Sequence, residues 1–167
     1  MKIIAKMLNS TSKINFWLLA KVINRVIPFN KPHDFTLMEG SNGLIQVKIP
    51  YARKNMNHLK GIHACAMATG GELVAGLNLI KNFDVKKYRL IMSELKVEYF
   101  KQGRTELFCE SSLNEEMEQK IKKNLEETGE YFIEMKTYLK NPAQDLIATV
   151  TTNWQLKDWN KIKSIKK

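Results

Sequence analysis

The stretch NHLKGIHACAMATGGELVAGL, residues 57–77, predicts the central element of the fold. It holds four of the eight glycines of the chain and, after Lys60, a single charged residue, Glu72. A helix that is apolar on all sides is typical of the core of a domain. We therefore expect a buried helix that begins close to His63.

Glu72 has no cation within one turn of this helix. The residues three and four positions away are small: Ala68, Thr69, Ala75 and Gly76. Burial of a carboxylate without a partner is costly, and desolvation raises its pKa toward the range of a general base. Two hypotheses stay open: Glu72 acts in a site, or it points to solvent or pairs with a lysine from a strand.

Strand-like runs lie on both sides of the helix. FTLME and LIQVKIPY flank an Asn42-Gly43 hairpin signal before it. Four runs follow it: RLIMSELKVEYF and RTELFCESS, joined by a tight turn at 101–103, then EYFIEMKTYLK and DLIATVTTNWQLKD. In the last run, strict alternation from Leu146 to Leu156 predicts a long antiparallel strand with one face on a core.

A shorter amphipathic helix is inserted among these strands. Its apolar residues recur every four positions from Leu113 to Leu125, and Gly129 provides a C-terminal stop. One antiparallel sheet wrapped around one central helix satisfies this order with short connections, which predicts an α+β fold.

The first thirty residues predict a terminal amphipathic helix. Positions 14, 18, 22 and 26 are apolar at helical spacing, while the basic side chains lie elsewhere on the wheel. The longest apolar run, Phe16–Ala20, is too short to span a bilayer, and the segment lacks the features of a secretion signal. We expect this helix (1–30) to pack on a single domain (31–167), with docking on a membrane surface as the alternative.

Composition limits the functional classes. The 167 residues fit one domain with its own core, and a formal net charge of +10 favours anionic partners: nucleic acid, anionic lipid or a phosphorylated small molecule. Cys65 and Cys109 are too few for a disulfide framework, which favours the cytoplasm.

His63 and Glu72 cannot meet within one chain if the helix is continuous. Nine residues separate them, which places them about 13 Å apart on opposite faces. They could share a site if two such helices lay antiparallel across a twofold axis. A homodimer, or a dimer of dimers, is therefore the expected assembly.

The helix start supplies further polar groups. Gly61 permits a tight turn, and the amides of Ala64 and Cys65 lack intrahelical acceptors, so they can stabilise an oxyanion. Asn57 and His63 can hydrogen-bond a substrate or a water molecule there. An oxyanion pocket and a carboxylate base suit the hydrolysis of esters or thioesters.

Asn57, His63 and Glu72, in this order and spacing, resemble the motif of the hotdog-fold acyl-CoA thioesterases, especially the phenylacetyl-CoA thioesterase type. The resemblance covers roughly residues 30–157 and looks most like a branch without an assigned function, extended by an N-terminal helix. It implies a sheet wrapped around a central helix, a dimer with sites at its interface, and acyl-CoA or an acyl carrier protein thioester as substrate. No separate cofactor is implied, because coenzyme A enters with the substrate.

The resemblance also assigns roles to residues. Glu72 would be the base or nucleophile, Asn57 would orient water or thioester, and His63 with the amide of Ala64 or Cys65 would bind the carbonyl. Ala64 and Cys65 stand where the family carries two glycines, which can narrow the approach of the thioester. Four basic residues are candidates for the phosphates of coenzyme A: Arg53, Lys54, Lys60 and Arg104.

Several rival functions remain. A metal site is disfavoured, because the spacing of five between His58 and His63 does not place ligands on one helix face. Cys65 as a nucleophile is a minor alternative, since a lone cysteine in an apolar helix is more often a core residue. Trp154 falls on the apolar face of its strand, so we expect no nucleic-acid partner. A non-catalytic acyl-CoA or lipid binder and a hydratase or dehydratase on the same scaffold stay open.

Overall fold

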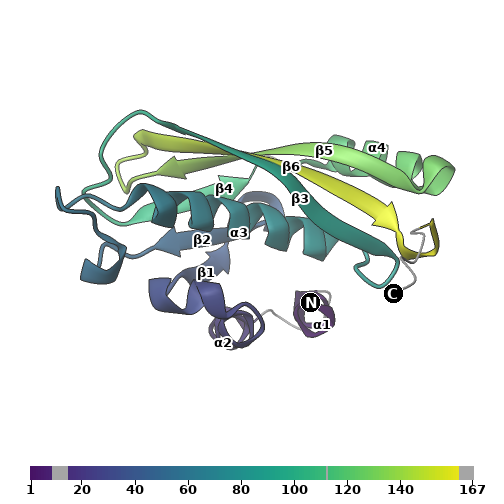
Figure 1. Cartoon of the computed structure of the whole chain (residues 1–167), viewed down its shortest axis with the longest axis horizontal. Helices are drawn as coiled ribbons and strands as arrows, with labels where there is room; N and C mark the ends of the chain where they lie inside the picture. Colours follow the sequence, from purple (N-terminus) through teal and green to yellow (C-terminus); the bar gives the residue numbers. More distant parts are fainter. Residues whose placement is uncertain (9–14, 112, 162–167) are drawn as a thin grey trace, which may run out of the picture.

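The computed structural model describes residues 1–8, 15–111 and 113–161 (Figure 1). Its helices are α1 (Lys2–Leu8), α2 (Phe16–Val26), α3 (Ala64–Asn82) and α4 (Glu115–Thr128). Its strands are β1 (Thr36–Glu39), β2 (Ile45–Ile49), β3 (Tyr88–Tyr99), β4 (Leu107–Ser111), β5 (Glu130–Lys140) and β6 (Leu146–Asp158). Short 3-10 turns, η1 to η4, lie at Pro28–His33, Ser41–Gly43, Arg53–Asn55 and Trp159–Lys161.

The six strands form one antiparallel sheet in the order β1-β2-β4-β5-β6-β3. The sheet curves around α3, which confirms the α+β class and the wrapped helix (Figure 1). β1 and β2 pair through the turn that contains Gly43, as the hairpin signal predicts. β3 and β4 are adjacent in sequence but not in the sheet, because β3 pairs with β6 at one edge and β4 lies between β2 and β5. The turn expected at 101–103 is therefore part of a crossover between strands that do not pair.

Two glycines allow α3 to lie directly on the sheet. A Cβ atom at Gly70 would come within 2.7 Å of Ile49 Cδ1 on β2, and one at Gly71 within 2.5 Å of Val150 Cγ2 on β6. Both distances are shorter than carbon atoms tolerate, so neither position has room for a side chain. The small residues of the motif thus set how closely the helix approaches the strands.

A buried amide anchors the other half of α3. Asn78 is fully buried, and its Oδ1 accepts from the Ile45 amide at 2.7 Å. Its Nδ2 donates to the Ile45 carbonyl at 3.0 Å and to Ser111 Oγ at 2.9 Å. These bonds satisfy the backbone amide and carbonyl of the first residue of β2 and join the start of β2 to the end of β4.

β6 and α4 complete the core as the sequence predicts. From Ala148 to Leu156, every second residue of β6 is buried on the α3 side. α4 packs on β5 and β6 through Ile121 and Leu125, and it ends at Gly129, whose φ of 72° is the left-handed C-cap.

The N-terminal region differs from the single helix expected for residues 1–30. It forms α1 and α2, which pack on each other beneath α3 on the side away from α4 and β5 (Figure 1). The core side of α2 is formed by Leu19 and Ile23, whereas Leu18 and Val26 are exposed; Ile14 lies outside the described residues. The segment is apolar around most of the wheel, so the packing surface was decided by tertiary contacts and not by the four-residue spacing.

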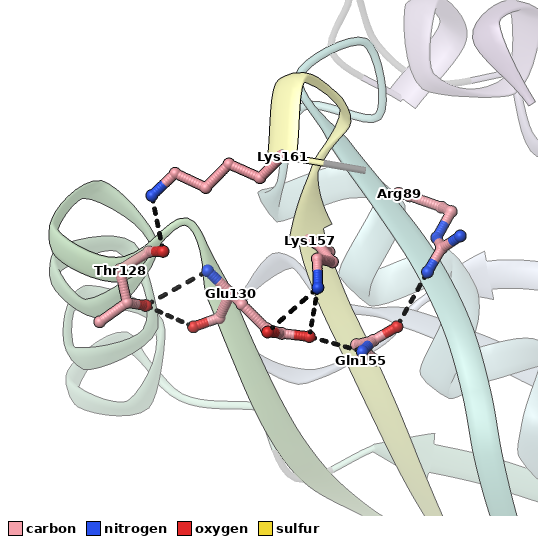
Figure 2. A network of polar contacts seen from close by, with 6 residues as sticks. All are labelled: Arg89, Thr128, Glu130, Gln155, Lys157 and Lys161. Atoms are coloured by element: carbon pink, nitrogen blue, oxygen red, sulfur yellow. Dashed lines mark hydrogen bonds and ion pairs between the residues drawn. The ribbon is translucent and has the colours of Figure 1, made fainter. Parts of the chain in front are cut away.

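A polar network ties the outer face of three strands together (Figure 2). Gln155 on β6 accepts from Arg89 Nη2 on β3 at 3.0 Å and donates to Glu130 on β5 at 2.5 Å. Lys157 lies 3.3 Å from both oxygens of the Glu130 carboxylate. The network joins β5, β6 and β3 beside the C-terminal end of α4, where Lys161 donates to the Thr128 carbonyl.

Candidate functional site

His63 caps the N-terminus of α3. It has extended backbone dihedrals, and its Nδ1 accepts from the Cys65 amide at 3.1 Å. The His63 amide donates to the Asn55 carbonyl at 2.7 Å. The bond to His63 Nδ1 engages the Cys65 amide, one of the two amides expected to bind an oxyanion. The other, the Ala64 amide, has no acceptor among the described residues. The His63 ring is exposed at the helix start.

Asn55 fixes this cap, although the sequence did not single it out. It is 1% exposed, and its Nδ2 donates to the carbonyls of His33 and Pro50 at 3.0 and 3.1 Å. Its Oδ1 lies 3.0 Å from His33 Nδ1, and the His33 ring stacks on Phe35 with centroids 5.0 Å apart. The cap of α3 is therefore held by the end of η1 and by η3.

Asn57 shapes the loop that leads into the helix. Its side-chain Oδ1 accepts from the backbone amides of Leu59 and Gly61 at 2.9 and 3.1 Å. Its backbone amide donates to the Gly61 carbonyl at 2.8 Å. These bonds hold a turn in which Lys60 has a φ of 58°. The carbonyl oxygen of the side chain is thus used by the loop, while Nδ2 is the group that can still donate to a substrate.

A hollow of about 320 Å³ opens at this helix start. Asn57, Gly61, Ala64 and Met67 line one side, and the end of β3 with residues 99–102 lines the other. Tyr99 Oη donates to the Ala64 carbonyl at 3.1 Å, which joins β3 to α3 across the hollow. Burial, with a contribution from the charge of Cys65, raises the pKa of Tyr99, so its hydroxyl keeps its proton. Tyr99 and its neighbours were missed, because only the crossover after β3 brings them here.

Glu72 is half-buried on the same helix and has no ion pair or hydrogen bond with any described residue. Burial raises the pKa of its carboxyl. Gly76 lies beside it: a Cβ atom built on that glycine would be 3.9 Å from Glu72 Oε1 and 3.2 Å from the edge of the Trp154 ring. The hypothesis that a lysine from a strand neutralises Glu72 is therefore wrong for the described residues.

The structure keeps Glu72 and His63 apart. α3 is one unbroken helix from Ala64 to Asn82, so nine residues correspond to about 13 Å and to half a revolution around its axis. Asn57, His63 and the Ala64 amide form one group at the helix start, and Glu72 lies alone farther along. No single chain brings the expected site residues together.

The candidate contacts for phosphates surround the helix start. The amide of Ile62 donates to the Gly103 carbonyl at 2.8 Å, which places the loop containing Arg104 beside the 57–63 loop. Arg53, Lys60 and Arg104 are exposed; Arg104 Nε donates to Gln102 at 3.0 Å. Lys54 is paired with Asp34. Three of the four basic groups are thus exposed without a carboxylate partner among the described residues, and none of the four lines the hollow itself.

The remaining candidates are dispersed. His58 and Cys65 are exposed, and Cys109 is buried beneath Gly70, where burial raises the pKa of its thiol. In the part of the chain that the structure describes, no three His, Cys, Asp or Glu side chains cluster as a metal site would require. Nor is any described helix long and apolar enough to cross a bilayer.

Solved structures share this architecture. A Pseudomonas aeruginosa protein of unknown function, described as a probable thioesterase, has a TM-score of 0.76 at 20% identity over 85% of this chain and 95% of its own. A Bacillus halodurans protein solved with CoA gives 0.62 at 16% identity over 93% and 89%. A Staphylococcus aureus thioesterase variant gives 0.59 at 14% identity over 78% and 98%. No curated protein matches the sequence.

The curved antiparallel sheet, the enclosed helix and these neighbours define a hotdog-fold protein. Within that class, the chain belongs to the DUF4442 family, a domain of unknown function whose model matches residues 16–156. The fold and the resemblance to thioesterase-like hotdog proteins are thereby confirmed, whereas the roles of individual residues stay predictions.

Proposed function

We propose that this protein is a thioesterase that hydrolyses an acyl-CoA or acyl carrier protein thioester at a site shared by two subunits. The observation that carries the proposal is Glu72, a half-buried carboxylate for which the described residues provide no partner. It lies on the helix whose start holds Asn57, His63 and the Ala64 amide, which has no acceptor among the same residues. A hotdog neighbour solved with CoA and others described as thioesterases support the substrate class.

The edge strand β3 supports a dimer. It is twelve residues long, and among the described strands it pairs with β6 alone. Its side chains Ile91, Met92, Leu95 and Tyr99 are 37 to 47% exposed. The opposite edge, β1, has only four residues and is covered by α2. A long apolar edge is prone to pair with another strand, so pairing of β3 with β3 of a second copy is the arrangement we infer. It would bring two copies of α3 antiparallel to each other.

In this dimer, each site would combine Glu72 of one subunit with Asn57, His63 and Ala64 of its partner. The ionised Glu72 takes a proton from water, which attacks the thioester carbonyl carbon. The amide of Ala64 donates to the developing oxyanion, and the polar groups of Asn57 and His63 orient water and thioester. When the carbon–sulfur bond breaks, the proton returns from Glu72 to the leaving thiolate, which yields a carboxylic acid and the free thiol.

Release of free thiol from a panel of acyl-CoA thioesters tests the activity. We expect turnover in the wild type, and turnover lost with binding kept in Glu72→Gln. His63→Ser removes the imidazole and retains a good N-cap residue, so it should also lose turnover without loss of the helix start. Absence of thiol release with every thioester would refute the proposal.

A mixture of the two variants tests the shared site. Two equivalent sites per dimer mean that a hybrid of Glu72→Gln and His63→Ser carries one intact site and one doubly altered site. After exchange of subunits in a 1:1 mixture, about a quarter of the wild-type activity should return. If both variants are inactive alone and the mixture stays inactive, the site lies within one chain.

One observation favours the second candidate, a non-catalytic binder of acyl-CoA or lipid. The Cys65 amide donates to His63, so the Ala64 amide is the one backbone donor left at the helix start among the two expected. The thioesterases that the motif resembles carry two glycines at these two positions. Binding of acyl-CoA by calorimetry without thiol release would support it. Consumption of an enoyl-CoA without thiol release would instead indicate a hydratase or dehydratase.

A further inference from the structure

The first 33 residues of the sequence carry one sign of charge. They contain six Lys and Arg, at positions 2, 6, 13, 21, 25 and 31, and no Asp or Glu. The formal net charge of the whole chain is +10, so this fifth of the sequence contributes six of those charges. The first acid, Asp34, is paired with Lys54 outside the helices. A surface formed by this segment attracts anions and has no carboxylate of its own to oppose them.

The same segment exposes large apolar side chains. Trp17 is 67% exposed and Phe29 71%, the two highest values among the exposed large apolar side chains of the described residues. Leu18 is 45% exposed beside them, and Ile3 on α1 53%. Side chains of this size and exposure, gathered on one segment, mark an interaction surface.

Apolar and basic groups share one face of α2. At 100° per residue, Trp17, Leu18, Lys21 and Arg25 lie within about 100° of one another, opposite the buried Leu19 and Ile23. The Lys21 ammonium lies 3.6 Å from the centroid of the Trp17 ring. Long basic side chains extend toward phosphates while aromatic rings enter the apolar boundary of a bilayer.

α1 adds a basic hollow to this surface. A cavity of about 650 Å³ lies along α1, lined by Lys2, Lys6 and Lys86 with Ile3, Ala5 and a single acid, Asp84. Asp84 Oδ1 already accepts from the Lys86 amide at 2.8 Å. α1 and α2 lie side by side beneath α3 (Figure 1), so the hollow and the exposed face of α2 belong to one layer.

We propose that this layer, α1, α2 and the turn through Phe29, docks on the surface of an anionic phospholipid membrane. Its basic charge without acids selects an anionic partner, and its exposed Trp, Phe and Leu require an apolar phase, which a lipid headgroup boundary provides together. α2 packs on β1, at the edge of the sheet opposite β3, so dimerisation through β3 leaves the layer free. The docking does not depend on the thioesterase proposal.

Flotation with vesicles tests the docking. We expect the wild type to co-float with vesicles of phosphatidylcholine in which about a third of the lipid is phosphatidylglycerol, to stay behind with phosphatidylcholine alone, and to dissociate at high salt. Each basic residue near such a surface contributes about fivefold in binding, so Lys21→Glu/Arg25→Glu should bind more than about tenfold more weakly. Trp17→Ser/Phe29→Ser should also lose binding, because it removes the apolar contact.

Matched variants on α4 and β5 serve as controls. Phe132 on β5 is 63% exposed, and Lys120 and Lys123 on α4 are exposed. Phe132→Ser and Lys120→Glu/Lys123→Glu should bind vesicles as the wild type does, although the second changes the net charge as much as the α2 variant. Equal losses in both sets, equal binding to neutral vesicles or no binding at all would overturn the docking.

Trp17 also reports its own environment. Addition of anionic vesicles should shift the tryptophan emission of the wild type to shorter wavelength, and Trp17→Phe should lose this shift while it still co-floats. Because Trp17→Phe keeps an apolar ring on the exposed face of α2, we expect it to fold as the wild type does, and the lost emission shift then reports Trp17 alone. If Trp17→Ser/Phe29→Ser changes the molar mass in solution instead, the layer is covered by a second copy and the membrane proposal is wrong.

Discussion

The Glu72 carboxylate opposes the stability of the protein that carries it. Burial raises its folded pKa above the unfolded value, so the folded state holds the proton more tightly. The stabilisation that protonation provides is complete below the unfolded pKa and is lost as the pH rises through the folded pKa. In the part of the chain that the structure describes, no cation lies against this half-buried side chain, and a carboxyl with a raised pKa in such surroundings is a candidate for a functional group.

Glu72→Gln should therefore stabilise the fold while it abolishes turnover. We expect a higher melting temperature than the wild type at neutral pH, and no difference below the unfolded pKa of a glutamate, about 4.3. Turnover should fall by about a hundredfold or more, the usual contribution of a general base. Melting followed by circular dichroism measures the first effect, and Glu127→Gln, on the exposed side of α4, is the control. A lower melting temperature for Glu72→Gln would mean that the assembled protein provides a partner for the acid.

The pH profile of hydrolysis should show the same raised pKa. Glu72 must be ionised to take a proton from water, so kcat/KM should decline on the acid side around a pKa above the ordinary glutamate value. Initial rates across an acid to neutral series measure this limb. A limb at the ordinary carboxyl value would indicate that another group limits the reaction.

The glycines of α3 determine how the helix meets the sheet. Gly71→Ala places a methyl group 2.5 to 3.0 Å from three atoms of Val150, so either the helix or β6 must shift. We expect a loss of about 1–3 kcal/mol in the free energy of unfolding, as for other overpacked cores. Gly76→Ala is the comparison, because its Cβ would lie 3.2 Å from the Trp154 ring edge and alanine favours the helix. Denaturant titration should show a smaller loss of unfolding free energy for Gly76→Ala than for Gly71→Ala. Equal losses would contradict a specific clash between position 71 and Val150.

The edge strand β3 is the element on which assembly should depend. Leu95→Lys places a charge in the middle of the exposed apolar edge, where β3–β3 pairing would desolvate it. We expect this variant to be a monomer by sedimentation analysis and to have lost hydrolysis with it. Phe132→Lys, on the outer face of β5, should leave the assembly unchanged. An active Leu95→Lys monomer would contradict the shared site.

At the scale of the molecule, positive charge around the hollow should govern the affinity for coenzyme A. Arg53→Ala/Arg104→Ala removes two exposed cations near the helix start, so KM for acyl-CoA should rise several-fold with little change in kcat. Steady-state kinetics in low salt measure the effect, because salt screens exposed charges. Lys120→Ala/Lys123→Ala removes the same charge from α4 and should leave KM unchanged. A similar rise of KM in both variants would mean that the net charge of the protein, and not the position of these two arginines, governs the affinity.

The fold could be predicted from the sequence because its signals are local. Alternation in β6, the glycine stop of α4 and the apolar run of α3 each arise from neighbouring residues. The strand order was not accessible in the same way, since the paired residues of β3 and β6 lie 49 to 70 positions apart in the sequence. For the same reason Tyr99 and Asn55 escaped notice as supports of the helix start, and tertiary packing decided which side of α2 is buried.

β6 lies between β5 and β3 and is the last of the six strands to leave the ribosome. Until residues 146–158 emerge, β3 has no neighbour in its own chain, and the Gly71 side of α3 has no Val150 to cover it. Chains that lack β6 therefore expose an apolar strand and a glycine-rich helix together, and exposed surfaces of this kind are prone to aggregation. Pairing of β6 with β3 then covers one side of the strand and the Gly71 face of the helix in a single step.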